Sequence, residues 1–267
     1  MKNILTFDIE DWYHANYPQM EIPDNSMEHS LEENVSILLK LCRKYNAKGT
    51  FFILSSEAEK NPFIVEMILK EGHEIGSHGY SHELVYKMGR ESFERDLKKS
   101  IEILKGITGS KLLSYRAPSW SVRKEMLWFF ETLREEGIKF DSSIFPLKTF
   151  LFGDPDSPAH PFEIEGIIEI PASAINLFGV RIPFGGGFSF RLFPFFLTEN
   201  FIKRLNRKGF PAVVYLHPRE IDPKHPRLSL PLRERFIHYY NIKNTLKKLE
   251  DLLKKFQFVS IGEYFGN

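Results

Sequence analysis

Short apolar runs alternate with longer amphipathic stretches along this chain, and this alternation limits the folds it can adopt. Runs of three to six mainly apolar residues, typical of buried strands, occur at 4–7, 49–54, 74–77, 112–115, 138–140, 167–170, 212–216 and 258–260. Apolar residues recur at helical spacing at 31–45, 62–71, 92–107, 123–136, 197–208 and 232–256. Strands that alternate with helices form parallel sheets. At 267 residues, the pattern predicts an α/β fold, a single distorted (β/α)7–8 barrel over 1–267.

One segment interrupts the alternation. Residues 145–196 are rich in Pro, Gly and Phe and are long for a connection, so we expect a functional excursion from the barrel. Within it, the Phe-rich segment 184–196 has two interpretations. It is a loop and strand packed over one side of the barrel, or it forms a wall of the substrate groove or a patch that rests on lipid.

Composition excludes several classes of protein. A net charge of +1 gives no argument for nucleic-acid binding, and the single cysteine, Cys42, cannot form a disulfide within the chain. The opening run is strand-like, and no apolar run reaches the length of a membrane span. We therefore expect a cytoplasmic protein. Peripheral contact with a membrane or a lipid-linked sugar is the alternative, because Lys and Arg outnumber Asp and Glu by ten to five between Arg219 and Lys255.

Reactive side chains follow five of the predicted strands, and the carboxyl ends of barrel strands meet at one rim. Each has a structural explanation by itself, since an Asp after a strand often caps a helix. His78 and His82, four residues apart, would face the same way on one helical turn and supply two ligands to a divalent metal. The residues at the five strand ends are Asp8, Glu10, Asp11, His78, His82, Arg116, Asp141 and His217.

These residues belong to motifs that occur together in a known family. The motifs are residues 6–11 (TFDIED), 77–82 (SHGYSH), 116–118 (RAP), 141–142 (DS) and 216–218 (LHP). In their order the chain resembles the polysaccharide deacetylases of carbohydrate esterase family 4, which share the chitooligosaccharide-deacetylase homology domain. Residues 185–187 and 215–223 resemble the subgroup associated with bacterial exopolysaccharide gene clusters.

The resemblance implies a hydrolase of non-peptide amide bonds that removes acetyl groups from an N-acetylated sugar in a polysaccharide or its precursor. It implies one divalent metal ion, with zinc expected, bound by Glu10, His78 and His82. The usual family pattern has two adjacent aspartates after the first strand, whereas here Ile9 separates Asp8 from the next acids. Asp11 therefore stays an alternative to Glu10.

The resemblance also implies a role for each remaining residue. Asp8 would be the general base, held by Arg116, and a backbone N–H just after Arg116 would contact the oxyanion. His217 would be the general acid, oriented by Asp141. The alternatives are a structural ion pair for Arg116, a helix cap for Asp141 and a buried strand-end histidine for His217.

Trp120 and Tyr80 would stack on sugar rings, although packing in the core explains such aromatic residues equally well. Two other functions keep the same residues. One is hydrolysis of a small cyclic amide at the same metal site, and the other is carbohydrate binding without catalysis.

Overall fold

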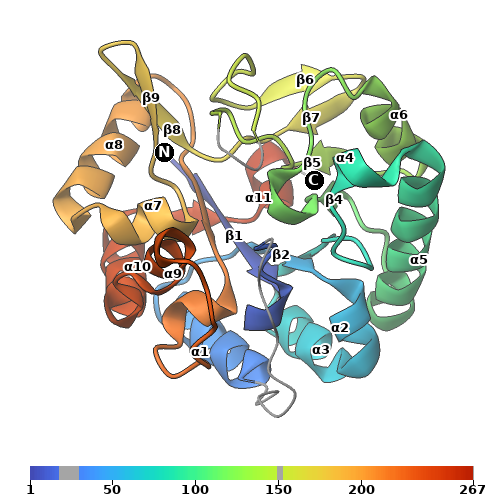
Figure 1. Cartoon of the computed structure of the whole chain (residues 1–267), viewed down its shortest axis with the longest axis horizontal. Helices are drawn as coiled ribbons and strands as arrows, with labels where there is room; N and C mark the ends of the chain where they lie inside the picture. Colours follow the sequence, from blue (N-terminus) through green and yellow to red (C-terminus); the bar gives the residue numbers. More distant parts are fainter. Residues whose placement is uncertain (18–29, 149–152, 267) are drawn as a thin grey trace.

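A curled, mainly parallel sheet forms the centre of the molecule (Figure 1). The computed structural model describes residues 1–17, 30–148 and 153–266. Neighbouring strands run in the order β10-β1-β2-β3-β4-β5-β7, all parallel, with β6 antiparallel to β7 at the edge and β11 also beside β1. Their bounds are β1 (Asn3–Ile9), β2 (Thr50–Ile53), β3 (Glu74–Ser77), β4 (Ser114–Tyr115), β5 (Phe140–Asp141), β6 (Phe162–Ile164), β7 (Ile167–Glu169), β10 (Val213–Leu216) and β11 (Phe258–Val259).

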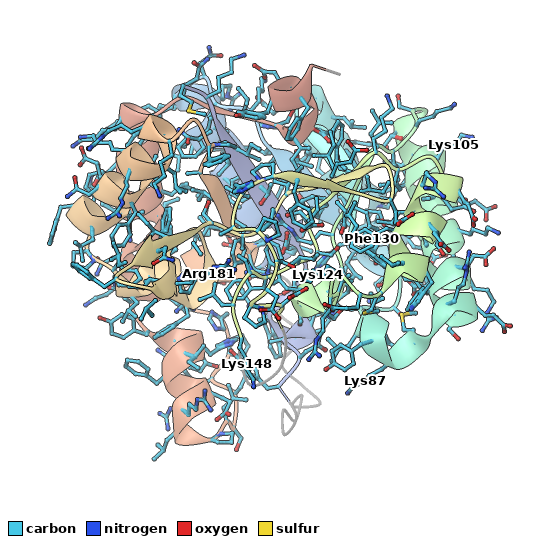
Figure 2. All side chains as sticks on the ribbon, turned by 90° about the horizontal axis from the view of Figure 1, so that it is seen from above. Lys87, Lys105, Lys124, Phe130, Lys148 and Arg181 are labelled. Atoms are coloured by element: carbon cyan, nitrogen blue, oxygen red, sulfur yellow. The ribbon has the colours of Figure 1, made fainter. Side chains whose placement is uncertain are left out.

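The combination of this sheet with the surrounding helices confirms the predicted α/β barrel-type fold. The helices lie around the outside of the sheet except for α11, which lies at its centre, where Ile261 packs with Ile4 and Phe52 (Figure 1). They are α1 (Leu31–Lys44), α2 (Ser55–Lys60), α3 (Pro62–Lys70), α4 (Val85–Met88), α5 (Arg90–Thr108), α6 (Leu127–Glu135), α7 (Gly187–Leu192), α8 (Phe195–Arg207), α9 (Leu232–Tyr239), α10 (Thr245–Lys255) and α11 (Ile261–Phe265). Figure 2 shows that the helices have a buried apolar face and an exposed polar face: Phe130 of α6 is buried, whereas Lys105 of α5 projects to the outside.

Strand β1 positions the first acidic residues. All seven of its residues are buried, and they alternate between two environments. Leu5, Phe7 and Ile9 belong to the main apolar cluster, together with residues of the helices, whereas Ile4 packs with Phe52 in a second cluster. Asp8 has the same parity as Ile4, so its side chain lies on the face opposite Ile9.

The excursion at 145–196 contains a second, two-stranded sheet formed by β8 (Ala174–Leu177) and β9 (Val180–Pro183). Arg181 of β9 holds the preceding segment, because its NH1 donates to the carbonyl oxygens of Pro146, Pro155 and Ser157 at 3.0, 2.9 and 2.7 Å (Figure 2). The Phe-rich segment is not the loop and strand of the first interpretation, since it forms α7 and the start of α8.

Glycines bring this excursion against β10. Gly186 forms a parallel bridge with Tyr215, and a Cβ atom at Gly186 would lie 2.2 Å from the Tyr215 ring. Ser173 adds a second connection, since its Oγ accepts from Val213 N at 2.6 Å and its carbonyl accepts from Phe184 N at 3.1 Å. The excursion thus extends the barrel wall beyond β10, where only glycine permits so close an approach.

The last long helical stretch is divided in two. The single helix expected at 232–256 is instead two helices, α9 and α10. They are separated by Asn241, which lies in the left-handed region (φ 57°), and by a 3-10 turn, η4 (Ile242–Asn244). Among the helices of the described ranges, none combines the length and apolar character needed to cross a bilayer.

Candidate active site

A cavity of about 370 Å³ opens at the carboxyl ends of β1, β3 and β10. Its walls include the 3-10 helices η1 (Trp12–His14), η2 (Pro118–Trp120) and η3 (Pro218–Ile221), and helices α7 and α9. Of the predicted site residues, Asp8, Glu10, His78, Trp120 and His217 line this cavity. The parallel sheet therefore brings together side chains that are up to about two hundred residues apart in sequence.

Glu10, His78 and His82 form a buried group whose ligand atoms all lie within 4.8 Å of one another. Glu10 Oε2 is 2.5 Å from His82 Nε2 and 3.6 Å from His78 Nε2. His78 Nδ1 donates to the Arg116 carbonyl at 2.7 Å, which leaves the Nε2 lone pair directed at Glu10. His82 Nε2 is buried and has no hydrogen-bond partner among the residues that the structure describes. Two imidazole nitrogens and a carboxylate that converge in this way suit a divalent cation.

The two histidines do not lie on a helical turn, so that expectation was wrong. The segment after β3 is a loop in which Gly79 and His82 both have positive φ (74° and 58°). Asp96 fixes the loop by accepting from the backbone N–H groups of Tyr80 and Ser81 at 2.8 and 2.9 Å. Loop curvature, rather than helical periodicity, places the imidazole rings of His78 and His82 5.4 Å apart.

Asp11, the alternative ligand, has a different place. Its Oδ1 accepts from Trp12 N at 2.7 Å and caps η1. Asp8 and Glu10, two residues apart at the end of a strand, both face the cavity, and Ile9 between them packs in the core. Burial would raise the pKa of Glu10, but the charges of His82 and His217 outweigh burial and hold that pKa well below its ordinary value.

Arg116 lies beside Asp8, the contact expected from the sequence. The side chain of Arg116 is fully buried, and its NH1 donates to Asp8 Oδ1 at 2.6 Å and to Thr6 Oγ1 at 2.9 Å. Its other nitrogens donate to the carbonyl and hydroxyl oxygens of Ser142. The N–H of Ala117, directly after Arg116, donates to Ser143 Oγ at 2.8 Å, so this N–H is already used within the protein.

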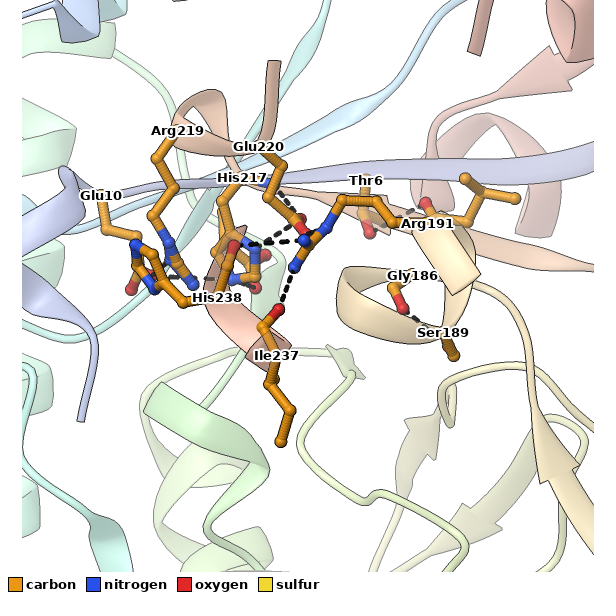
Figure 3. Close-up of polar contacts among 12 residues, drawn as sticks. Thr6, Glu10, Gly186, Ser189, Arg191, His217, Arg219, Glu220, Ile237 and His238 are labelled. Atoms are coloured by element: carbon orange, nitrogen blue, oxygen red, sulfur yellow. Dashed lines mark hydrogen bonds and ion pairs between the residues drawn. The ribbon is translucent and has the colours of Figure 1, made fainter. Parts of the chain in front are cut away.

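His217 is oriented by Glu220, and the expectation that Asp141 does this was wrong (Figure 3). The chain turns into η3 directly after β10, so the residue three positions on folds back over the imidazole. Glu220 Oε2 lies 2.9 Å from His217 Nδ1 and accepts from His217 N at 3.1 Å. His217 Nε2 then faces the cavity, 3.7 Å from Asp8 Oδ2 and 3.6 Å from Glu10 Oε1.

Arg191 of α7 supports this pair from behind. Its Nε donates to Glu220 Oε1 at 2.9 Å (Figure 3). Burial would raise the pKa of Glu220, but the hydrogen bond from His217 and the charges of Arg191 and Arg219 outweigh it and lower that pKa. Glu220 is therefore a carboxylate at neutral pH, able to stabilise a protonated His217.

Asp141 belongs to a separate buried cluster. It accepts a hydrogen bond from Ser143 Oγ at 2.5 Å, and its other neighbour is the carboxyl group of Glu169. Burial raises the pKa of Asp141 to about 6 and, together with the nearby charge of Asp141, raises the pKa of Glu169 well above its ordinary value. The pair therefore retains a proton near neutral pH, and it supports the loop that holds Arg116 rather than the imidazole.

The two aromatic candidates differ in position. Trp120 lines the cavity but is only 4% exposed, and it packs against the Arg116 guanidinium, 4.6 Å from the ring centroid. The ring of Tyr80 lies under Lys99 Nζ at 3.4 Å, and its hydroxyl donates to Glu59. Tyr80 is not among the residues that line the cavity, so stacking on substrate fits Trp120 better.

Comparison with known families agrees with this geometry. The family model described as polysaccharide deacetylase matches residues 4–137, half of the chain. The chain belongs to the polysaccharide deacetylase family. A second model, a domain of unknown function (DUF3473), matches residues 142–266. The metal group, Asp8 and Arg116 thus come from the polysaccharide deacetylase region, and His217 and Glu220 from the other.

Curated relatives of this polysaccharide deacetylase family member include enzymes named for peptidoglycan. A peptidoglycan deacetylase from Helicobacter pylori is 36% identical over 113 residues, which cover 42% of this chain and 38% of that protein. A peptidoglycan-N-acetylglucosamine deacetylase from Bacillus cereus is 33% identical over 124 residues, covering 42% of this chain and 45% of that one. The similarity thus spans less than half of each of these relatives.

Solved structures support the fold. The crystal structure of a Mycobacterium smegmatis protein described as a polysaccharide deacetylase superposes on this chain with a TM-score of 0.62 at 18% identity. The superposition covers 98% of this chain and 87% of that one. The Bc1960 peptidoglycan N-acetylglucosamine deacetylase has a TM-score of 0.53 at 19% identity, covering 98% and 86%. The polysaccharide deacetylase fold therefore extends over nearly the whole chain.

Several residues of this polysaccharide deacetylase site were missed in the sequence. Glu220 and Arg219 lie within three residues of His217, and the spacing of Glu220 was the available signal, since a residue three positions into a helical turn reaches back to its start. His14 also lines the cavity, and burial lowers its pKa to about 4. Arg191 carried no signal, because its partners are more than 25 residues away.

Proposed function

We propose that this chain is a metal-dependent N-deacetylase that hydrolyses the acetamido group of an N-acetylated sugar and releases acetate. The observation that carries the proposal is one cavity holding a Glu-His-His group, a carboxylate paired with a buried guanidinium, and an imidazole paired with a carboxylate. Membership of the polysaccharide deacetylase family supports it, as do the similar peptidoglycan deacetylases from Helicobacter pylori and Bacillus cereus.

Glu10, His78 and His82 would hold the metal ion. The orphaned Nε2 of His82 and the close approach of Glu10 are the features that a cation would explain. Three ligands from the protein leave positions open, and such an ion acts as a Lewis acid that polarises a carbonyl and acidifies water. Two nitrogen ligands and one oxygen ligand fit zinc, our preferred ion, as well as other first-row divalent ions.

Asp8 would accept the proton of the attacking water. Arg116 is buried and tightly paired with Asp8, so it fixes the orientation of this carboxyl group. His217 would donate a proton to the departing amine, since its Nε2 faces the cavity and lies 3.7 Å from Asp8 Oδ2. Glu220 stabilises the protonated form of His217 before the transfer.

The substrate is the finer part of the proposal. An N-acetylated amino sugar within a polysaccharide or its precursor fits the family and the similar peptidoglycan-N-acetylglucosamine deacetylase from Bacillus cereus. We propose an exopolysaccharide in particular, on the resemblance of residues 185–187 and 215–223. Trp120 is the residue we assign to stacking on a sugar ring. We further propose that 1–267 works as one barrel domain, because β10, in the second half, pairs with β1 in the first.

The test is acetate release from acetylated amino-sugar oligomers by the metal-loaded chain, with Asp8→Asn as the decisive variant. This variant keeps the metal ligands but lacks the proton acceptor, so we expect a loss of about 10²–10⁴ in kcat. Elemental analysis should still show about one divalent ion per chain, as three protein ligands imply. Undiminished turnover in Asp8→Asn would exclude Asp8 as the base, and cleavage of small cyclic amides alone would favour the other hydrolase.

A further inference from the structure

One guanidinium in the cavity wall has no part in the proposed chemistry. Arg219 follows Pro218 in η3, and its side chain is only 15% exposed. Its NH1 lies 3.6 Å from Glu10 Oε1, yet this nitrogen has no hydrogen-bond partner among the described residues. Figure 3 shows the side chain reaching from η3 toward Glu10, beside His217. A buried N–H without an acceptor is costly, so the arrangement leaves a donor for a ligand.

Arg191, which also lines the cavity, makes the contrast clear. Its three nitrogens donate to Glu220 and to the backbone carbonyl oxygens of Ile237, His238 and Tyr240 at 2.5–3.1 Å. All three nitrogens of Arg191 are therefore already hydrogen-bonded within the protein. Arg219 differs because its NH1 forms an ion pair with Glu10 but no hydrogen bond with a described residue. This ion pair lies in the part of the cavity where the reaction would occur.

The charge of the cavity points to the kind of ligand. Three carboxylates line it, those of Asp8, Glu10 and Glu220, and three guanidiniums balance them, those of Arg191, Arg219 and Arg233. Arg116 behind Asp8 adds a positive charge, and a divalent ion at the metal group would add two more. A cavity with an excess of positive charge and apolar walls attracts anions and concentrates them.

We propose that the substrate carries an anionic group, a carboxylate or a phosphate, close to the acetamido group, and that Arg219 binds it. This inference rests on the proposed deacetylase function, which it deepens by assigning a substrate class. Guanidinium donors match the geometry of both anions. The position of Arg219 NH1 and His217 Nε2, each 3.6 Å from Glu10 Oε1, places the anion within one sugar unit of the reacting amide.

The experiment compares matched pairs of sugars that differ only in charge, with the metal-loaded full chain. The pairs are N-acetylmuramic acid and its methyl ester, an N-acetylglucosamine phosphate and N-acetylglucosamine, and an oligosaccharide of alternating N-acetylglucosamine and glucuronic acid and its methyl ester. We expect kcat/KM for acetate release to favour at least one anionic member by roughly ten- to hundredfold at low salt. The preference should shrink as salt is raised. The pair that responds distinguishes a carboxylate from a phosphate.

Variants assign the preference to Arg219. Arg219→Gln should abolish it while the neutral partners change only a few-fold, and Arg219→Lys should retain part of it. Arg204→Gln, on the exposed side of α8, is the matched control and should leave the preference unchanged. Calorimetric binding of the same pairs to the Asp8→Asn chain gives a readout that does not depend on turnover.

Two outcomes overturn the inference. One is hydrolysis of the neutral sugars with no gain for any anionic partner. The other is an equal loss on neutral and anionic sugars in Arg219→Gln, or a loss of metal, either of which would mean that Arg219 serves Glu10 or the reacting amide. Absence of acetate from every sugar would instead refute the proposed function, and the calorimetric preference would still decide whether Arg219 binds anions.

Discussion

Residues 4–137 place their reactive groups with regular parallel strands, whereas residues 142–266 place theirs with short turns and an excursion from the barrel. Asp8, Glu10 and His78 stand at strand ends and are held by backbone and core packing. His217 also follows a strand, but its orientation depends on η3 and on Arg191 of α7. The comparison separates a region whose regular strands position Asp8 and the Glu-His-His group from one whose turns and excursion position His217.

The largest expected effect tests the first region. His78→Ala removes one of three protein ligands, so the metal content should fall from about one ion per chain to nearly none, and acetate release should cease. Asp11→Asn is the matched control, because Asp11 caps η1 and should leave metal binding intact. Metal loss in Asp11→Asn, measured by elemental analysis, would reverse the assignment of Glu10.

The next effect tests the second region. Glu220→Gln cannot stabilise a protonated His217 as a carboxylate does, so kcat should fall roughly ten- to hundredfold, a part of what a general acid contributes. Asp141→Asn should change kcat only a few-fold. A larger loss in Asp141→Asn than in Glu220→Gln would restore the partner that was expected from the sequence.

A smaller effect concerns the contact between the two regions. Gly186→Ala places a Cβ atom against the Tyr215 ring, so the free energy of unfolding should fall by about 1–3 kcal/mol. Gly106→Ala is the control, because nothing lies within 4 Å of the added atom in helix α5, and it should stabilise the chain by about 0.5–1 kcal/mol. Urea unfolding measures both. An unchanged midpoint for Gly186→Ala would show that the excursion adjusts freely.

The smallest effect concerns the buried carboxyl pair. The folded-state pKa of Asp141 is raised to about 6 and that of Glu169 is raised further. The folded chain therefore binds protons that the unfolded chain has lost, and the resulting stability, present at pH 4, declines as pH rises through 6. Glu169→Gln removes one titrating group and should flatten this decline by about 1 kcal/mol. Urea midpoints measured between pH 4 and 8 test this prediction. An equal dependence of stability on pH in Glu169→Gln and in the unchanged chain would contradict the raised pKa of the pair.

Sequence reasoning succeeded where function follows strand order. The strands at 4–7, 74–77 and 212–216 and the reactive residues after them were predictable, because buried strands read as apolar runs and their ends meet at one rim. The contact between Arg116 and Asp8 came from family resemblance, and the structure shows the same contact.

The failures share a physical cause. The conformation of the loop that carries His78 and His82 depends on Asp96, a helix residue more than a dozen positions away. The choice of Glu220 over Asp141 depends on how the chain turns after β10, and helical or strand periodicity does not encode such turns. Arg191 reaches its partners only through the folded excursion.

Arg191 couples the motions of three segments that surround the cavity. A single side chain ties α7, the 3-10 turn after β10 and the last carbonyl oxygens of α9. These segments cannot open one at a time without breaking its bonds, so their amide protons should exchange with solvent as one cooperative unit. The wall of the cavity around His217 would then open as a block, so the free energy of opening this block, rather than the motion of any one helix, would set how often the wall opens.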